Sequence, residues 1–264
     1  MKKLTSIVLG MFVFAGITAE QKFEKPEQFE RNAGLKYTSE VNRISGTNRL
    51  LGREFIAIDP EAVYTLRITA RKVPGSPDFY VHAGFLLYDE SMTELKPYFY
   101  RAEYNTESIL LEPISKGSKT VKIRKPHWFP EDVVRRAWFL ALDTKTDKSD
   151  IPNRNVNSVA KYELTDDNTV ILTLCTGVGK SYPAGTGIRF HSSGPAGMYP
   201  LLNGVKVTEE FQNYHAVIKG ISGGQHLNKF WKGAAFVKLV ISNSPASGDR
   251  NIAFEFKDLT LTVE

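Results

Sequence analysis

Apolar and polar residues alternate along many short segments of this chain. Residues 64–71 show the pattern most clearly, because Tyr, Leu, Ile and Ala occupy every second position and Thr and Arg occupy the positions between. Such a period of two places one face of a strand on a core and the other toward solvent. Most other apolar segments are also short, rich in β-branched and aromatic residues, and bounded by Gly, Pro, Asn or Asp. Strands are expected at residues 55–58, 64–71, 79–88, 108–111, 120–123, 138–142, 170–175, 188–191, 215–219, 235–242 and 252–263.

These segments predict an all-β protein, a sandwich or a barrel, with little helix. In the last expected strand the alternation shifts phase near Asp258, which predicts a β-bulge at that point. Residues 144–157 lack a strand pattern and are rich in loop-forming residues, so we expect an irregular connection there.

The first 19 residues have the pattern of a secretory signal. Lys2 and Lys3 precede an apolar run at residues 7–15, and the small residue Ala19 precedes the expected cleavage site. The run is shorter than the roughly 20 residues that span a bilayer, and no later segment is apolar enough to do so. We therefore expect an exported protein whose residues 20–264 form a single domain in the periplasm, at the cell surface or outside the cell.

The distribution of charge limits the kind of binding partner, and the cysteine content limits how the fold can be stabilised. The formal net charge is +5, and both signs are spread along the chain, which argues against a nucleic-acid-binding stripe. The single cysteine, Cys175, cannot form an intramolecular disulfide, so the fold must depend on its core. Cys175 ends an apolar run, and we expect a buried thiol. Nothing in the sequence sets an oligomeric state.

Two parts of the chain share strand patterns with a known family. Residues 55–66 have the pattern of a strand, a turn through Asp-Pro and a second strand that opens with Tyr-x-Leu, and residues 79–88 follow as a third strand. Near the C-terminus, residues 236–241 and 252–261 have the pattern of two further strands. Together they resemble the jelly-roll carbohydrate-binding modules of the family 4, 9 and 22 group, in the broad galactose-binding-like fold.

The resemblance covers roughly residues 50–90 and 214–264. It implies an all-β sandwich of the jelly-roll kind, in which approximately residues 97–205 are a large central elaboration. It also implies that Asp258 in the final strand helps to hold a structural Ca²⁺. Glu30, near the first expected strand, is our candidate for a second ligand. The family usually has two acidic residues where this chain has Lys257-Asp258, and Ca²⁺ takes about six to eight oxygen ligands.

Sugar recognition needs aromatic faces against C–H surfaces and polar side chains for hydroxyl groups. Trp128 is the strongest candidate, because it lies in a proline-bounded loop, Pro126-His127-Trp128-Phe129-Pro130, where an aromatic ring is difficult to bury completely. An aromatic group at residues 98–104 supplies further rings. The full set of candidate carbohydrate-binding residues is Trp128, Tyr98, Tyr100, Arg189, His191, Tyr199 and Trp231.

The sequence therefore favours an exported, non-catalytic protein that binds a polysaccharide or another glycan, with no nucleic-acid partner and no transmembrane segment. One alternative is a jelly-roll polysaccharide lyase or glycoside hydrolase, in which Arg189, His191 and Tyr199 would act on an acidic sugar. A second alternative is a cell-surface adhesion or structural domain that binds protein. The arrangement of His191 discriminates the first two, since a lyase needs this ring in a groove beside a tyrosine and a basic residue.

Overall fold

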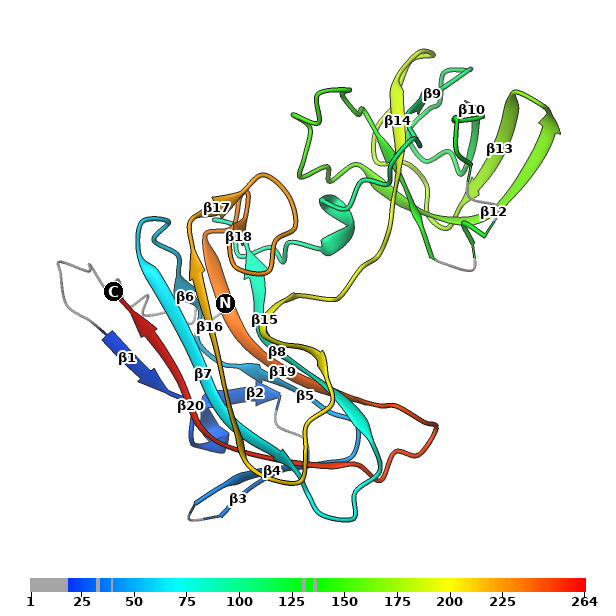
Figure 1. The fold of residues 1–264 in the computed structure, drawn as a ribbon. Helices are drawn as coiled ribbons and strands as arrows, with labels where there is room; N and C mark the ends of the chain where they lie inside the picture. The colour runs from blue at the N-terminus through cyan, green and yellow to red at the C-terminus, as the bar shows by residue number, and fades with distance from the viewer. Residues whose placement is uncertain (1–18, 32–33, 39, 130–131, 135–136) are drawn as a thin grey trace, which may run out of the picture.

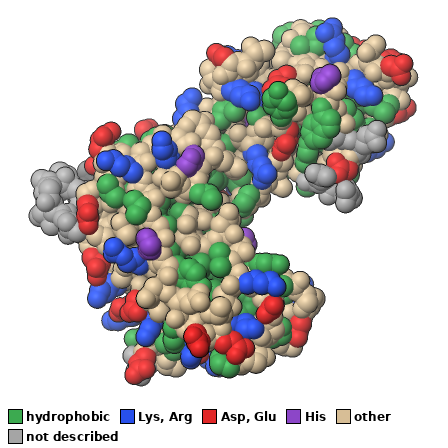
Figure 2. Space-filling view, in the orientation of Figure 1, with side chains coloured by type: hydrophobic (Ala, Val, Ile, Leu, Met, Phe, Trp, Pro, Cys, Tyr) green, Lys and Arg blue, Asp and Glu red, His purple; other side chains and the backbone are tan. Residues whose placement is uncertain are grey.

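The computed structural model describes residues 19–31, 34–38, 40–129, 132–134 and 137–264. Two lobes are visible in Figure 1: a sandwich built from both ends of the chain, and an insertion built from its middle. Figure 2 shows that the surface is hollowed between them. Among the described residues, no helix is long and apolar enough to cross a membrane.

The first sheet of the sandwich has the strand order β16-β7-β20-β4-β3, with β1 beside β20. All of its pairings are antiparallel. Its strands are β1 (Ala19–Lys22), β3 (Leu35–Tyr37), β4 (Asn42–Ser45), β7 (Val63–Lys72), β16 (Gln212–Lys219) and β20 (Ala253–Val263).

The second sheet has the order β15-β8-β19-β5-β2, with β6 beside β19, and is likewise antiparallel. Its strands are β2 (Phe29–Arg31), β5 (Arg49–Gly52), β6 (Ile56–Ala57), β8 (Phe79–Tyr88), β15 (Met198–Val205) and β19 (Phe236–Pro245). A short parallel pair, β17 (Ile221–Ser222) and β18 (Phe230–Trp231), lies outside both sheets.

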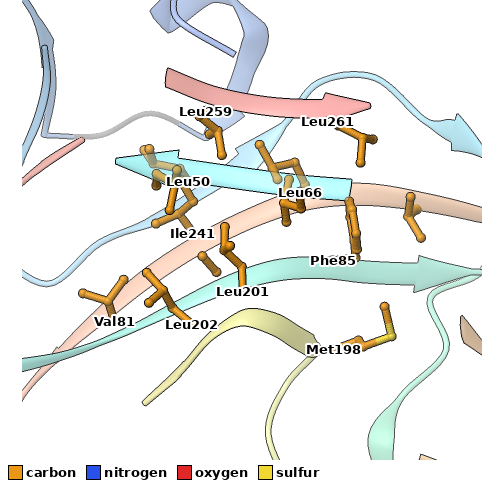
Figure 3. Close-up of a cluster of buried hydrophobic side chains, with 14 of the residues drawn as sticks. Leu50, Leu66, Val81, Phe85, Met198, Leu201, Leu202, Ile241, Leu259 and Leu261 are labelled. Carbon is orange, nitrogen blue, oxygen red and sulfur yellow. The ribbon is translucent and has the colours of Figure 1, made fainter. Parts of the chain in front are cut away.

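The core of the sandwich follows directly from the alternation in the sequence. Tyr64, Leu66, Ile68 and Ala70 of β7 are buried, because each second side chain of the strand points between the sheets. Side chains from β8, β15 and β19 meet them from the other sheet, as Figure 3 shows for a group of labelled residues. The labelled residues are Leu50, Leu66, Val81, Phe85, Met198, Leu201, Leu202, Ile241, Leu259 and Leu261.

The insertion has a sheet and a hydrophobic core of its own. Its strand order is β10-β13-β12-β11-β14-β9, and a bridge between Leu110 and Ile123 joins the two ends of that order. The sheet therefore closes around a second core that includes Trp138 and Phe190. The strands are β9 (Ser108–Ile109), β10 (Thr120–Arg124), β11 (Phe139–Leu142), β12 (Val156–Asp166), β13 (Thr169–Leu174) and β14 (Gly187–His191).

The expected all-β sandwich is confirmed, as is the bulge near Asp258. The register of β20 against β7 shifts between Lys257 and Thr260, and Asp258 has a positive φ of 51°. The irregular connection expected at residues 144–157 ends earlier than predicted, since β12 begins at Val156.

The structure also bears on the expectations for Cys175, for residues 198–205 and for the N-terminal segment. The thiol of Cys175 is exposed, so the prediction of a buried thiol was wrong; β13 ends at Leu174, one residue before it. Residues 198–205, which the expected elaboration included, form β15 and pair with β8 of the sandwich. Residues 1–18, which hold nearly all of the predicted signal, lie outside the described residues, and β1 begins at Ala19, opposite Val263.

Candidate functional site

A half-exposed tryptophan on the insertion is the most accessible of the seven predicted sugar-binding side chains. Trp128 is 44% exposed, whereas Trp138 and Trp231 are 3% and 2% exposed. Exposing the apolar surface of a large aromatic ring to water is unfavourable, and such exposed rings are typical of binding sites. Trp128 is therefore the centre of the candidate site.

The aromatic core of the insertion holds Trp128 in place. Its ring lies 5.2 Å from the ring of Trp138, tilted by 53°, and Trp138 in turn packs 6.3 Å from Phe190. The next residue, Phe129, is buried and packs edge-on against Tyr162 and Phe190, at 5.0 and 5.8 Å. Because these rings fix the segment on both sides of its Cα, the exposed face of Trp128 is supported from below.

A second segment lies beside Trp128 and adds an aromatic residue that was not among the predicted site residues. The backbone N–H of Trp128 donates to the carbonyl of Asn105 at 3.0 Å, which places Tyr104 on the adjacent loop. Tyr104 is 78% exposed, the highest value among the exposed large hydrophobic residues. The side chains of Asn105 and His127 are also exposed. Two aromatic rings with amide and imidazole groups nearby supply the chemistry that a sugar surface needs.

Tyr98, Tyr100 and Trp231 are brought together near the junction of the two lobes, but as packing residues. Tyr98 stacks on Phe139 with ring centres 4.0 Å apart. The hydroxyl of Tyr100 donates to the carbonyl of Lys232 at 2.7 Å, and its ring lies 5.2 Å from that of Trp231. Burial raises the pKa of Tyr100 well above its ordinary value. Tyr100 and Trp231 belong to the sandwich core and present little surface to a ligand.

Arg189 and His191 form a buried polar cluster instead of a sugar-binding pair. Both residues are fully buried. The Arg189 guanidinium donates through Nη2 to Asp150 Oδ2 at 2.8 Å and through Nε to His191 Nε2 at 3.1 Å. The other ring nitrogen, Nδ1, lies 2.6 Å from the carbonyl of Tyr98. Since Nε2 accepts a hydrogen bond, Nδ1 must carry the proton and donate it.

The electrostatics of this cluster match a neutral imidazole. Burial, with the nearby Arg189 charge as a smaller contribution, lowers the pKa of His191 to about 4. Asp150 is the counter-ion of Arg189, and its hydrogen bonds from Asn153, the Lys145 backbone and Arg189 outweigh burial and lower its pKa. All of these groups are paired with one another, so the cluster links the insertion to the segment at residues 98–99.

Tyr199 lies on the outer face of the second sheet and is only 4% exposed. It packs there with Leu51, Leu86 and Val240 in a small separate cluster, and burial raises its pKa. The structure thus places Arg189 and His191 in one cluster and Tyr199 in another.

The predicted calcium ligands lie on different sheets. Glu30 is in β2, and its carboxylate accepts a hydrogen bond from Lys238 Nζ at 2.7 Å. Asp258 is exposed at the bulge of β20, in the first sheet. Within the described part of the chain, no group of three or more His, Cys, Asp or Glu residues is placed to hold a metal ion.

An open hollow of about 420 Å³ lies at the end of β8, between residues 89–91 and 233–235. Its one strongly perturbed group is Asp89, whose pKa is lowered to about 2, first by the hydroxyl of Ser91. The same carboxylate accepts hydrogen bonds from the backbone of Ser91 and Thr93 and from Arg154. The Asp89 carboxylate therefore stabilises its own turn, and none of the residues that line the hollow is aromatic.

Comparison with known proteins adds no assignment: neither the protein-family models nor the curated proteins give a match to this chain.

Proposed function

We propose that this protein is a non-catalytic carbohydrate-binding protein and that the insertion carries the binding surface. The observation that supports the proposal most directly is the half-exposed Trp128 ring, held from below by Trp138, with Tyr104 exposed on the adjacent loop. A rigid aromatic platform beside polar side chains suits the C–H faces and hydroxyl groups of a polysaccharide.

The lyase or hydrolase alternative has less support. It requires His191 to reach a substrate, yet both nitrogens of this buried ring are already hydrogen-bonded, to Tyr98 and Arg189. The adhesion alternative would rest on the exposed apolar side chains near one end of the sandwich, Val217, Ile221 and Leu227. The residues available for the lyase and adhesion alternatives thus support those functions less well than the Trp128 platform supports sugar binding.

The test compares two substitutions that remove exposed aromatic rings of similar accessibility. Trp128→Ala removes the proposed platform, and Tyr37→Ala is the matched control, because Tyr37 is 47% exposed and lies on β3 of the sandwich. Retention is measured in native gels containing xylan, β-glucan, galactan or polygalacturonate. We expect Trp128→Ala to weaken binding to the retained polysaccharide by about tenfold or more, since central aromatic residues dominate binding energy. Tyr37→Ala should change it less than about twofold.

Two results would contradict the proposal. One is full retention by Trp128→Ala of every polysaccharide that the unmodified protein binds. The other is the absence of stable binding together with release of unsaturated sugar products, which would favour the lyase.

A further inference from the structure

The outer face of the first sheet carries a concentration of positive charge. We call it the basic face and define it by Lys36, Arg43, Arg67, Arg71 and Lys257. Arg67 lies between Leu66 and Ile68, which point into the core, so its side chain is on the outer side of the sheet, as is that of Arg71 four residues later in β7. Strand register places Lys36, Arg43 and Lys257 on the same side.

Strand register places the cations in adjacent rows. Lys36 of β3 is opposite Arg43 of β4, which is opposite Glu255 of β20, and Glu255 is opposite Arg71 of β7. This row crosses four strands, which lie about 4.8 Å apart. The next rows contain Lys257, opposite Thr69, and Arg67, opposite Thr260 and His215. The cations therefore cover an extended area instead of surrounding one point.

The acidic residues on this face are too few to neutralise it. The carboxylate of Glu255 lies 2.7 Å from Arg71 Nη2 and 3.9 Å from Arg43 Nη1, so one negative charge is shared between two guanidinium groups. A second carboxylate, Asp258, lies at the bulge beside Lys257. Glu20 of β1, opposite Thr262, also lies on this face, but it is paired with Lys22. Five cations against Glu255 and Asp258 give a local excess of three, which the Lys22–Glu20 pair leaves unchanged, on a chain whose total formal charge is +5.

Two of the cations are available to a ligand. The side chain of Arg67 is exposed and has no hydrogen bond or ion pair to any described residue. Lys257 Nζ lies 5.0 Å from the centre of the Phe211 ring, and Arg71 lies 4.3 Å from it. Phe211 thus orients two positive charges without neutralising them.

Neutral hydrogen-bonding side chains fill the positions between the cations. Thr69, Asn213 and Thr260 occupy outward positions of β7, β16 and β20 in register with the cations or with one another, and Thr65 occupies a further outward position of β7. Thr69 and Asn213 already bond to each other at 2.7 Å. Hydroxyl and amide groups of this kind can bind the hydroxyl groups of a sugar chain, while the cations bind its acidic groups.

We propose that the basic face binds an acidic polysaccharide, a polymer that carries carboxylate or sulfate groups along its length. A small anion does not fit, because the cations are spread over several rows instead of converging. Single-stranded nucleic acid needs several aromatic rings for base stacking. On the described part of this face Phe211 is covered by Arg71 and Lys257, which leaves the imidazole of His215, opposite Arg67, as the uncovered ring. An anionic membrane surface is usually bound through apolar side chains inserted beside the cations, and the only large hydrophobic residue exposed on the described part of this face is Val217.

This inference is independent of the Trp128 platform, which lies on the other lobe. The decisive variant is Arg67→Glu/Lys257→Glu. Its matched control is Lys161→Glu/Lys229→Glu, which changes the net charge equally at exposed positions of β12 and of the loop before β18. Binding is measured by gel retention and calorimetry with polygalacturonate, with its fully methyl-esterified form, with a single-stranded oligonucleotide and with vesicles that contain phosphatidylserine.

We expect the unmodified protein to bind polygalacturonate more tightly than the esterified polymer, and salt to weaken that binding. The reversal variant should bind about tenfold more weakly, because two attractions become repulsions, and the control variant should be unchanged. Equal losses in the two variants, equal binding of the charged and esterified polymers, or preferential binding of the oligonucleotide or the vesicles would each overturn the proposal. Arg67→Gln, which removes an unpaired charge without adding one, should give a smaller loss in the same direction if the reversal variant folds poorly.

Discussion

The sandwich and the insertion are both closed around apolar cores, but the first sheet of the sandwich and the insertion place their basic residues differently. In the sandwich, the strands of the first sheet bury alternate apolar side chains and send most of their Arg and Lys residues to the outer face. In the insertion, several polar side chains are buried with the core, among them Arg189, His191 and Asn153. Those residues bond to one another and to backbone carbonyls.

The difference shows that the same residue types have different roles on the two lobes. An arginine in a strand with strict alternation, such as Arg67, lies at the surface and is free to meet a ligand. An arginine in the less regular strand β14, Arg189, pairs with a loop carboxylate and fixes the path of residues 145–150. Charge on the outer face of the first sheet is therefore suited to binding, whereas charge in the insertion core is structural, as is the buried Lys238 that pairs with Glu30 in the second sheet.

The largest expected effect comes from breaking the buried cluster. In Asp150→Ala, the fully buried Arg189 loses its counter-ion, which should lower the free energy of unfolding by about 3–5 kcal/mol. The pair is buried on both sides, with side-chain exposures of 0% and 7%. Urea denaturation followed by tryptophan fluorescence measures the change.

The control for this substitution is Glu112→Ala, which removes the partner of Lys122 in an exposed pair of the same lobe. An exposed pair contributes about 1 kcal/mol or less. Similar losses in Asp150→Ala and Glu112→Ala would show that the cluster is not structural and would remove the contrast between the lobes.

The next effect is on the pH dependence of stability. The pKa of His191 is about 4 in the folded protein and 6.5 without the fold's influence, so the unfolded chain binds more protons between these values. The neutral ring contributes fully to the free energy of unfolding above pH 6.5. This contribution is lost as the pH falls, and the loss reaches about 3 kcal/mol by about pH 4. Asp150, whose pKa is also lowered, adds to the loss at the acidic end, and His82 of the sandwich contributes in the same direction.

Substitution of the ring isolates its contribution. His191→Gln cannot take up a proton, so its free energy of unfolding should fall less between about pH 7 and pH 4.5 than that of the unmodified protein. Chemical denaturation at both pH values provides the comparison. An identical fall in the two proteins would exclude His191 as the origin of the acid sensitivity.

The smallest expected effect is that of calcium. Glu30 is already paired with Lys238, and Asp258 lies on the other sheet, so only one carboxylate of the predicted pair is free to bind the ion. Ca²⁺ usually takes about six to eight oxygens, and a weakly bound ligand stabilises little. We expect the melting temperature to shift by about 2 °C or less between excess Ca²⁺ and chelator. A larger shift that disappears in Asp258→Ala would establish a site at the bulge.

Much of the sandwich could be predicted from the sequence, because its strands alternate strictly. Residues 79–88 were predicted as a strand and form β8 with the same bounds, and residues 252–263 differ from β20 by one residue. β12 was missed although Tyr162 and Leu164 alternate with polar residues in its second half, because that half is largely exposed and follows a loop-rich stretch, and β15 was missed because it carries a bulged register against β8. The sequence of β15, with Pro200 and the pair Leu201-Leu202, lacks the period of two on which the prediction depends.

The candidate site was less predictable, and the reason is burial. Aromatic and basic residues have the same appearance in a sequence whether they line a groove or fill a core, and of the seven predicted sugar-binding residues, five are buried. Trp128 differs because the prolines around it limit how its loop can pack. The place of Tyr104 beside Trp128 depends on a contact between loops that are distant in sequence, Asn105 with Trp128, which a local pattern cannot reveal.

The most direct test of the proposed function is acrylamide quenching of tryptophan fluorescence in the presence of the polysaccharide that is retained most strongly in the gel panel. Trp128 is the one tryptophan with substantial exposure, so it should account for most of the quenching by this contact reagent. If the polysaccharide covers the Trp128 platform, saturating polymer should protect the fluorescence strongly, and the protection should be absent in Trp128→Phe. Unchanged quenching at a polymer concentration that saturates binding would contradict the central claim, because it would place the sugar elsewhere.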